Sequence, residues 1–209
     1  MKILVVADEH QEQEVRSKEI TPGNEIIFAK EFSEDELTTE YDAIFYLIEK
    51  ELNVLSTEGT PVFINLVKDT LAQKGLPGNF HRINGWPGFL ERSVWEIASI
   101  NASEASTIFT SLGWNMVAVK DEPGMVAGRV LCTIINEAFF ALGENVSTRE
   151  EIDNAMRLGT NYPYGPFEWM KKIGAQNIYQ LLSVLSQRDK RYSVAPLLEK
   201  EYRELAADK

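Results

Sequence analysis

The chain has 209 residues, of which 44% are hydrophobic and 25% are charged, the usual balance of a folded globular protein. Its formal net charge of -11 argues against nucleic acid and anionic membranes as general partners, because both need a basic surface. The single cysteine, Cys132, excludes a disulfide within the chain, argues against a cysteine-based metal cluster, and is interpreted as a small buried hydrophobe.

Short apolar runs bounded by turn residues fill the first part of the chain. They predict strands at Ile3–Ala7, Glu25–Ala29, Ala43–Leu47, Pro61–Asn65, a run ending Ser93–Ile97, and Asn115–Val119. Between the last two, Asn101 caps a helix that Gly113 stops. A capping box at Ser33–Glu36 predicts another short helical piece. This alternation indicates an open α/β sheet with reduced helices.

The segment after the first strand departs from the pattern of a dinucleotide-binding sheet. Such sheets place a glycine-rich turn there, so that a pyrophosphate can approach the backbone at a helix N-terminus. Residues 8–14 read Asp-Glu-His-Gln-Glu-Gln-Glu, with four carboxylates and no glycine. Side chains at these positions would obstruct the phosphates and their charge would repel them. A normally bound pyrophosphate is therefore not expected at this turn.

The second part of the chain has helical periodicity only. A hinge at Asp121-Glu122-Pro123-Gly124 precedes a helix over residues 125–142 with a wide apolar stripe, which is interpreted as core or dimer interface. Further helices are predicted at 151–158, from Pro166 onward, at 178–185 and at 196–205. The predicted organisation is an α/β domain over residues 1–120 and an all-α domain over 121–209.

A set of short motifs in the second part carries a family resemblance. The motifs are Asp121-x-Pro123-Gly124, Arg129-Val130-Leu131, Asn136-Glu137-Ala138, Asp153-x-Ala155-Met156-x-Leu158-Gly159, and Tyr162-Pro163-Tyr164-Gly165-Pro166-Phe167-Glu168. Their order and spacing resemble the C-terminal domain of the 3-hydroxyacyl-CoA dehydrogenase family. Before about residue 80 the likeness is only one of strand order.

The resemblance implies a Rossmann-like N-terminal domain, here shortened and degenerate. It also implies an all-α C-terminal domain of the 6-phosphogluconate/3-hydroxyacyl-CoA dehydrogenase type, a homodimer formed through that domain, NAD as cofactor and 3-hydroxyacyl-CoA as substrate. In the family a histidine acts as general base, and a glutamate twelve positions later orients it.

Carried over residue by residue, that glutamate falls on Glu96 and the histidine on Asn84. An asparagine side chain has no useful proton affinity near neutral pH, so Asn84 cannot replace a general base. The family's active-site asparagine falls on Gly128, which has no side chain. The family's Asn-Thr-Ser-Ser turn after the fourth strand corresponds loosely to Asn65-Leu66-Val67-Lys68, which has no serine. Glu96 itself is a retained functional residue or an ordinary solvated glutamate.

Several residues have two interpretations. His81 is a displaced base or, more simply, a solvent-facing histidine at the start of a loop, and His10 is interpreted as a solvated loop residue. Tyr164, Pro166 and Phe167 position a helix or line an acyl pocket. With two histidines and no matching carboxylate spacing, no metal site is predicted.

Two hypotheses follow from different classes. The first is an NAD-dependent oxidoreductase acting on 3-hydroxyacyl-CoA in fatty acid metabolism. The second, which the site residues favour, is a pseudoenzyme that keeps the fold and the dimer surface and binds an acyl-CoA-like small molecule or a partner protein. The apolar N-terminal run is too short for a signal peptide or a membrane span, so a cytoplasmic protein is expected.

Overall fold

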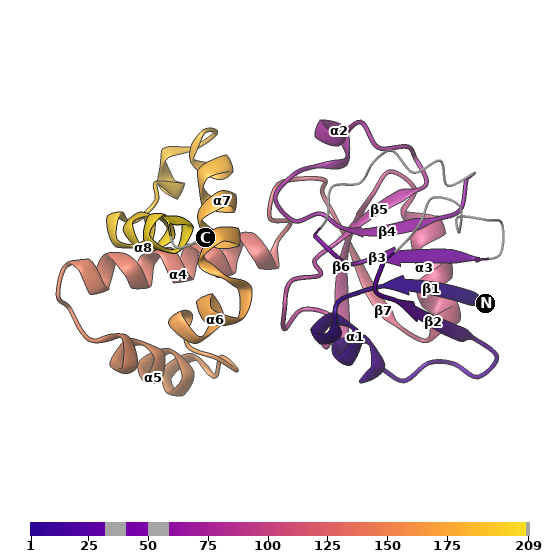
Figure 1. Cartoon of the computed structure of the whole chain (residues 1–209), viewed down its shortest axis with the longest axis horizontal. Helices are drawn as coiled ribbons and strands as arrows, with labels where there is room; N and C mark the ends of the chain where they lie inside the picture. Colours follow the sequence, from indigo (N-terminus) through magenta and orange to yellow (C-terminus); the bar gives the residue numbers. More distant parts are fainter. Residues whose placement is uncertain (32–40, 50–58, 208–209) are drawn as a thin grey trace. The chain divides into compact units, whose positions relative to one another are not determined.

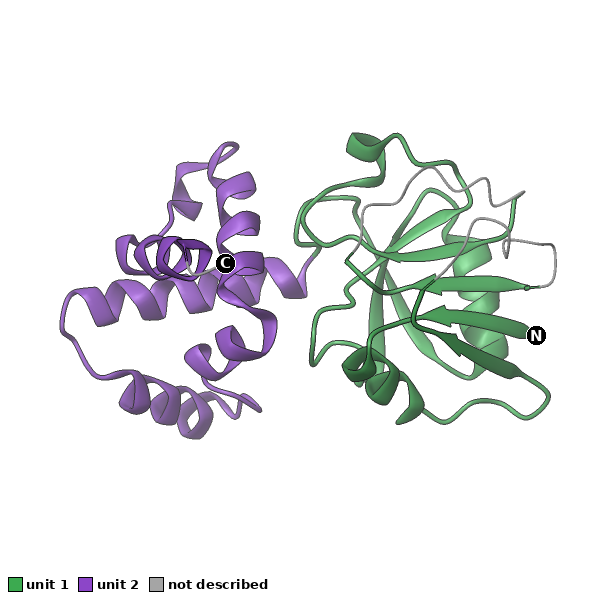
Figure 2. Ribbon diagram, in the orientation of Figure 1, with its two compact units in different colours: residues 1–125 green, residues 126–209 purple. Residues whose placement is uncertain are grey.

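The computed structural model describes residues 1–31, 41–49 and 59–207. The contacts within it divide the chain into two compact units, Met1–Met125 and Val126–Lys209, which are coloured separately in Figure 2. The capping box predicted at 33–36 lies outside the described residues. An α/β unit followed by a helical unit confirms the predicted fold class.

The first unit is built on a seven-stranded sheet with the order β2-β1-β3-β4-β5-β6-β7 (Figure 1). The strands are β1 Lys2–Val6, β2 Glu25–Ala29, β3 Ala43–Tyr46, β4 Val62–Asn65, β5 Phe80–Ile83, β6 Val94–Ser99 and β7 Asn115–Val119. Neighbouring strands are parallel except β5 and β6, which are antiparallel. The strand order reverses between β1 and β3, and open α/β sheets bind ligands beyond the carboxyl ends of the strands at such a switch point.

The two faces of the sheet have separate hydrophobic cores. On one face, side chains from β1, β3, β4 and β6 pack with Val15 of α1 (Glu9–Arg16) and Phe109 of α3 (Ala102–Leu112). This core holds an aromatic cluster in which Phe45 stacks on Phe63 at 4.5 Å between ring centroids. On the other face, strand side chains pack with Leu71 of the four-residue helix α2 (Leu71–Lys74).

Every strand expected from the sequence is present, but β5 was not predicted. The turn residues Asn84-Gly85 and Pro87-Gly88 dominate the local signal from Arg82 onward, and Phe-His-Arg-Ile is not a continuous apolar run. In the structure all four residues of β5 are buried. His81 and Arg82 are tolerated there because their side chains form hydrogen bonds with groups from other segments.

The second unit is entirely helical. Its helices are α4 Ala127–Gly143, α5 Arg149–Thr160, α6 Pro166–Ile173, α7 Ala175–Ser186, a 3-10 turn at Lys190–Tyr192, and α8 Pro196–Ala207. The long helix α4 packs against α6, α7 and α8. Its buried Asn136 accepts a hydrogen bond from the backbone N–H of Ala195 at 2.8 Å and donates to the carbonyl of Ser193 at 2.9 Å. This pair of bonds fixes the chain at the start of α8 against α4.

The Tyr-Gly-Pro-Phe-Glu motif forms the start of α6. Pro166 is its first residue, and the N–H of Phe167 donates to the carboxylate of Asp153 on α5 at 2.8 Å. A Cβ added at Gly165 would lie 2.3 Å from Asp153 Oδ1. Glycine is thus required at 165 because the carboxylate that caps α6 occupies the space of a side chain.

Gly165→Ala is expected to destabilise the helical unit by about 2 kcal/mol, because overpacking displaces the capping carboxylate. The midpoint of its thermal unfolding, followed by circular dichroism, should fall by roughly 5 °C. Gly159→Ala on α5 is the matched control, since nothing lies within 4 Å of its added Cβ. Its midpoint should be unchanged or slightly raised, and an equal loss in both variants would contradict this account.

Candidate dinucleotide and substrate site

The helix after β1 begins without a loop, and its N-terminus is capped by the chain itself. Only Ala7 and Asp8 separate β1 from α1. The Asp8 carboxylate accepts the N–H of Gln11 at 2.8 Å, and the side-chain oxygen of Gln11 accepts the N–H of Asp8 at 3.1 Å. A carboxylate in a capping box therefore stands where the helix N-terminus of a dinucleotide-binding sheet would face the pyrophosphate.

The side-chain nitrogen of Gln11 binds backbone carbonyls at the carboxyl ends of the strands. Gln11 is buried, and its Nε2 donates to the carbonyls of Leu47, beyond β3, and Gly85, beyond β5, at 2.7 and 3.0 Å. Asn65, at the end of β4, donates to the same Leu47 carbonyl at 2.9 Å and accepts the Gly85 N–H at 2.9 Å. The carboxyl ends of β3, β4 and β5 are thus joined by a continuous amide network.

Glu14 holds the loop that follows β5. Its buried carboxylate accepts the N–H groups of Gly88, Leu90 and Glu91 at 2.6, 3.0 and 3.3 Å. His10, one turn earlier on α1, lies 3.0 Å from the same carboxylate. The interpretation of His10 as a loop residue is therefore wrong, since it lies in the first turn of a helix.

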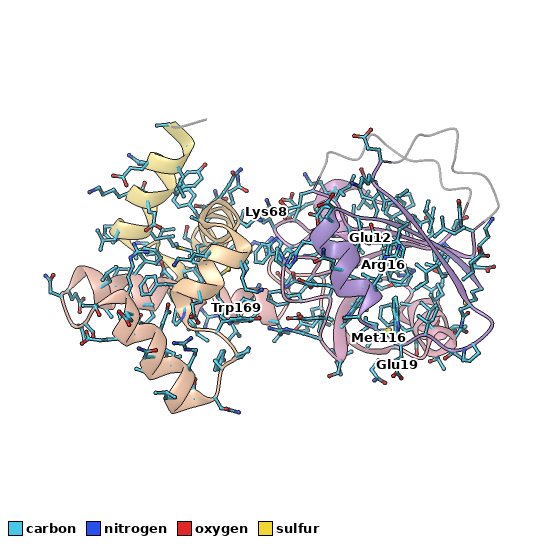
Figure 3. All side chains as sticks on the ribbon, turned by 60° about the horizontal axis from the view of Figure 1, so that its bottom comes forward. Glu12, Arg16, Glu19, Lys68, Met116 and Trp169 are labelled. Atoms are coloured by element: carbon cyan, nitrogen blue, oxygen red, sulfur yellow. The ribbon has the colours of Figure 1, made fainter. Side chains whose placement is uncertain are left out.

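The four carboxylates of residues 8–14 have different roles. Asp8 caps the helix and Glu14 binds the loop after β5. Glu9 and Glu12 form exposed ion pairs with Lys30 and Arg16. Figure 3 labels Glu12 and Arg16 on α1. Because α1 begins at Glu9, the segment interpreted as a turn is helix almost throughout.

Asn84 and Glu96, which the resemblance equates with the family's base and orienter, lie opposite each other at the end of the β5–β6 pair. In the antiparallel β5–β6 pair Ile83 faces Ile97, so the next residues in register are Asn84 and Glu96. Asn84 Oδ1 accepts the N–H of Trp86 at 3.1 Å, which fixes the orientation of the amide. Among the described residues, the buried Nδ2 of Asn84 has no hydrogen-bond acceptor. Glu96 is partly buried on β6.

Gly128 lies in the first turn of α4 and is buried. The hinge before it is anchored in the first unit: Asp121 pairs with the buried Arg82 at 2.5 Å and accepts the N–H of Leu71 at the start of α2 at 3.2 Å. The N–H of Gly124 donates to the carbonyl of Val67 at 2.8 Å. The Asp-x-Pro-Gly motif therefore fixes the end of the first unit.

The residues proposed for an acyl pocket lie around the start of α6. The rings of Tyr164 and Trp169 meet edge to face at 5.0 Å, and Phe167 packs in the same way on Phe139 of α4 at 5.1 Å. Pro166 is buried beside them. These contacts hold the start of α6 in place. A role of Tyr164, Pro166 and Phe167 in acyl binding stays a prediction.

The interpretation of His81 as solvent-facing is wrong. The imidazole is fully buried in β5, between Ser99 Oγ at 2.6 Å and the Glu104 carboxylate at 3.0 Å. Burial lowers the pKa of His81, and Glu104 opposes that shift only in part. Cys132 is buried in α4, and burial raises the pKa of its thiol, as expected of an inert side chain.

Sequence reasoning missed Gln11, Glu14 and Arg82 as organising residues. The spacing Asp8-x-x-Gln11 was a readable signal, because it is a capping-box pattern at a strand–helix junction. No local signal marked Glu14 or Arg82, whose partners lie far along the chain.

In the described ranges no cluster of three or more metal-ligating side chains is found. No helix among those residues is long and apolar enough to cross a membrane.

Comparison with known proteins is consistent with this geometry. Residues 124–206 match the profile of the 3-hydroxyacyl-CoA dehydrogenase C-terminal domain. The 3-hydroxyadipyl-CoA dehydrogenase of Escherichia coli (strain K12) is 43% identical over 88 residues, which are 41% of this chain and 18% of that protein. The probable 3-hydroxybutyryl-CoA dehydrogenase of Bacillus subtilis is 37% identical over 101 residues, 47% of this chain and 35% of that protein. The match thus spans well under two thirds of either relative.

The similarity in structure extends further than the similarity in sequence. The (S)-3-hydroxybutyryl-CoA dehydrogenase of Ralstonia eutropha superposes with a TM-score of 0.70 at 19% identity, covering 95% of this chain and 92% of that one, and this likeness concerns the fold alone. The fold is a mostly parallel sheet unit followed by a helical unit, as in that dehydrogenase. Residues 124–206 are similar to the C-terminal domain of the 3-hydroxyacyl-CoA dehydrogenase family.

Glu14→Ala is expected to lower the free energy of unfolding by about 2 kcal/mol, because buried N–H groups of the loop after β5 would lose their acceptor. Urea denaturation followed by tryptophan fluorescence measures the loss. Glu12→Ala removes only the exposed pair with Arg16 and should cost less than about 0.5 kcal/mol. A similar cost for both variants would show that the buried carboxylate has no special role.

Proposed function

We propose that this chain is a 3-hydroxyacyl-CoA dehydrogenase-like protein with impaired or absent hydride-transfer activity, and that NAD does not bind it in the usual way. NAD is the cofactor that the family resemblance implies. The single observation that carries the proposal is the closed N-terminus of α1, where Asp8 and Gln11 take the hydrogen bonds that a pyrophosphate would need. The residues present do not fit the cofactor, so no reaction step is derived through it.

The reaction-centre positions support the same proposal. Asn84 cannot take a proton from a substrate hydroxyl, and Gly128 offers no side chain to the reacting group. Glu96 remains, but a carboxylate that orients a base has no base to orient. Loss of these groups is compatible with a retained fold, because fold and function are specified by different residues.

The first test measures cofactor binding and turnover. A dinucleotide at 100 times its Kd would stabilise the chain by about 2.7 kcal/mol, whereas the proposal expects no shift in the melting temperature beyond about 1 °C with millimolar NADH. Acetoacetyl-CoA reduction should stay at background in the wild type. Reduction that Glu96→Gln lowers more than about tenfold, while Glu12→Gln leaves it unchanged, would overturn the proposal.

A second candidate function is a non-catalytic homodimer that binds an acyl-CoA-like small molecule or a partner protein, in the cytoplasm. The exposed apolar side chains of the helical unit support this candidate. Val130 of α4 and Val126 at the N-cap of that helix lie one turn apart and are 49% and 54% exposed. Contiguous exposed apolar side chains mark interfaces, and this pair is the candidate centre of one.

This candidate predicts a dimer in sedimentation velocity experiments. Val130→Glu should raise the dimer dissociation constant at least about tenfold by burying an unpaired charge. Leu205→Glu, on the exposed side of α8, is the control and should leave the constant unchanged. Isothermal titration with acetoacetyl-CoA then measures binding without turnover. A monomeric wild type that releases no heat would exclude the homodimer and the acyl-CoA-like ligand.

A further inference from the structure

The side chains of Ser99, His81 and Glu104 form a hydrogen-bonded series near the start of β5 and the end of β6. Because β5 and β6 are antiparallel, Ser99 at the end of β6 faces His81 near the start of β5. Ser99 Oγ lies 2.6 Å from His81 Nδ1, and His81 Nε2 lies 3.0 Å from Oε2 of Glu104 on α3. This Ser99–His81–Glu104 set lies toward the start of β5, whereas the amide network of Gln11 and Asn65 joins the carboxyl ends of β3, β4 and β5.

The partners within this set determine where its protons lie. An ionised Glu104 can only accept, so the imidazole Nε2 carries the hydrogen and Nδ1 is left as an acceptor. Ser99 Oγ accepts the N–H of Asn101 at 2.9 Å and is free to donate its own hydrogen to Nδ1. The order is therefore hydroxyl, neutral imidazole, carboxylate, which is the arrangement of nucleophile, base and orienting group.

The solvent exposure of His81 and Ser99 fits the roles of base and nucleophile. His81 is fully buried against the ring of Phe63, at 4.8 Å between centroids, so its orientation is fixed. Ser99 is partly exposed at the end of its strand. Helix α3 begins three residues later, at Ala102, and the side chain of its N-cap Asn101 accepts the N–H of Glu104 at 3.3 Å. This cap holds Glu104 in the first turn of the helix.

We propose that Ser99 is an activated nucleophile that is acylated by small activated acyl esters and thioesters, with His81 as its base and Glu104 as the group that orients the base. The Ser99 oxygen forms a bond to the acyl carbon while its proton moves to His81 Nδ1. The alcohol or thiol leaves with that proton, which restores the neutral imidazole. Water then releases the acid from the acyl-serine. The proposal is independent of the proposed function, since it uses none of the same residues.

The simplest competing account is that this set only joins β5, β6 and α3. Both accounts expect a lower melting temperature when His81 is replaced, so that variant alone does not decide between them. The acylation of Ser99 does decide, because a merely structural hydroxyl reacts no faster than other exposed serines.

The test uses the full chain with p-nitrophenyl acetate. The expected result is a burst of p-nitrophenolate with one acetyl group on Ser99, located by peptide mass spectrometry. Ser99→Ala should abolish the burst, and Ser103→Ala, which removes an exposed hydroxyl of α3, should retain it. Retained folding of Ser99→Ala is checked by circular dichroism.

Glu104→Gln separates the two accounts further, because Glu104 is partly exposed and its loss is tolerable. Its acylation rate should fall about 100-fold or more, because the imidazole loses the carboxylate that fixes its tautomer and orientation. The midpoint of the pH–rate profile should move to lower pH, since the carboxylate that raises the pKa of His81 is gone. No burst in the wild type, or acetylation confined to other residues, would overturn the proposal.

Discussion

The hydrogen bonds of Gln11 and Asp8 at the start of α1 are the constraint on which the first unit depends. They join the helix to the ends of β3 and β5 and leave the helix N-terminus capped by a carboxylate of the chain itself. A helix N-terminus is a ready site for an anion only while its N–H groups are open to one. In this chain the N-terminus of α1 binds the Asp8 carboxylate, which stabilises the fold. Glu14, later in the same helix, accepts backbone N–H groups of the loop after β5.

Arg82 connects this sheet to the family motif at the hinge. It is buried in β5 and pairs with Asp121, whose carboxylate also accepts an N–H group of α2. A buried guanidinium needs such partners, since an unpaired charge in the interior is strongly destabilising. The hinge residues thus have a structural role that does not depend on catalysis. Family motifs of this kind identify ancestry more directly than they identify activity.

The sequence predicted the strands with apolar character and the helices with clear caps, because both signals are local. It failed at β5, where two charged or titratable side chains occupy a central strand. It also placed His81 in solvent, although the side chain is fully buried between Ser99 and Glu104. In each case the partners that make burial favourable lie 15 to 40 residues away along the chain.

By itself the sequence determined the similarity of its second part to a dehydrogenase C-terminal domain and the order of an α/β part and a helical part. These follow from residue identity and spacing alone. Only the tertiary structure decided which polar side chains are buried and what they bind. Hydrogen bonds between distant segments determine which polar side chains are buried. The sequence alone therefore indicates only that the carboxylates of residues 8–14 would repel a phosphate. The folded chain uses Asp8 and Glu14 as internal ligands for backbone N–H groups.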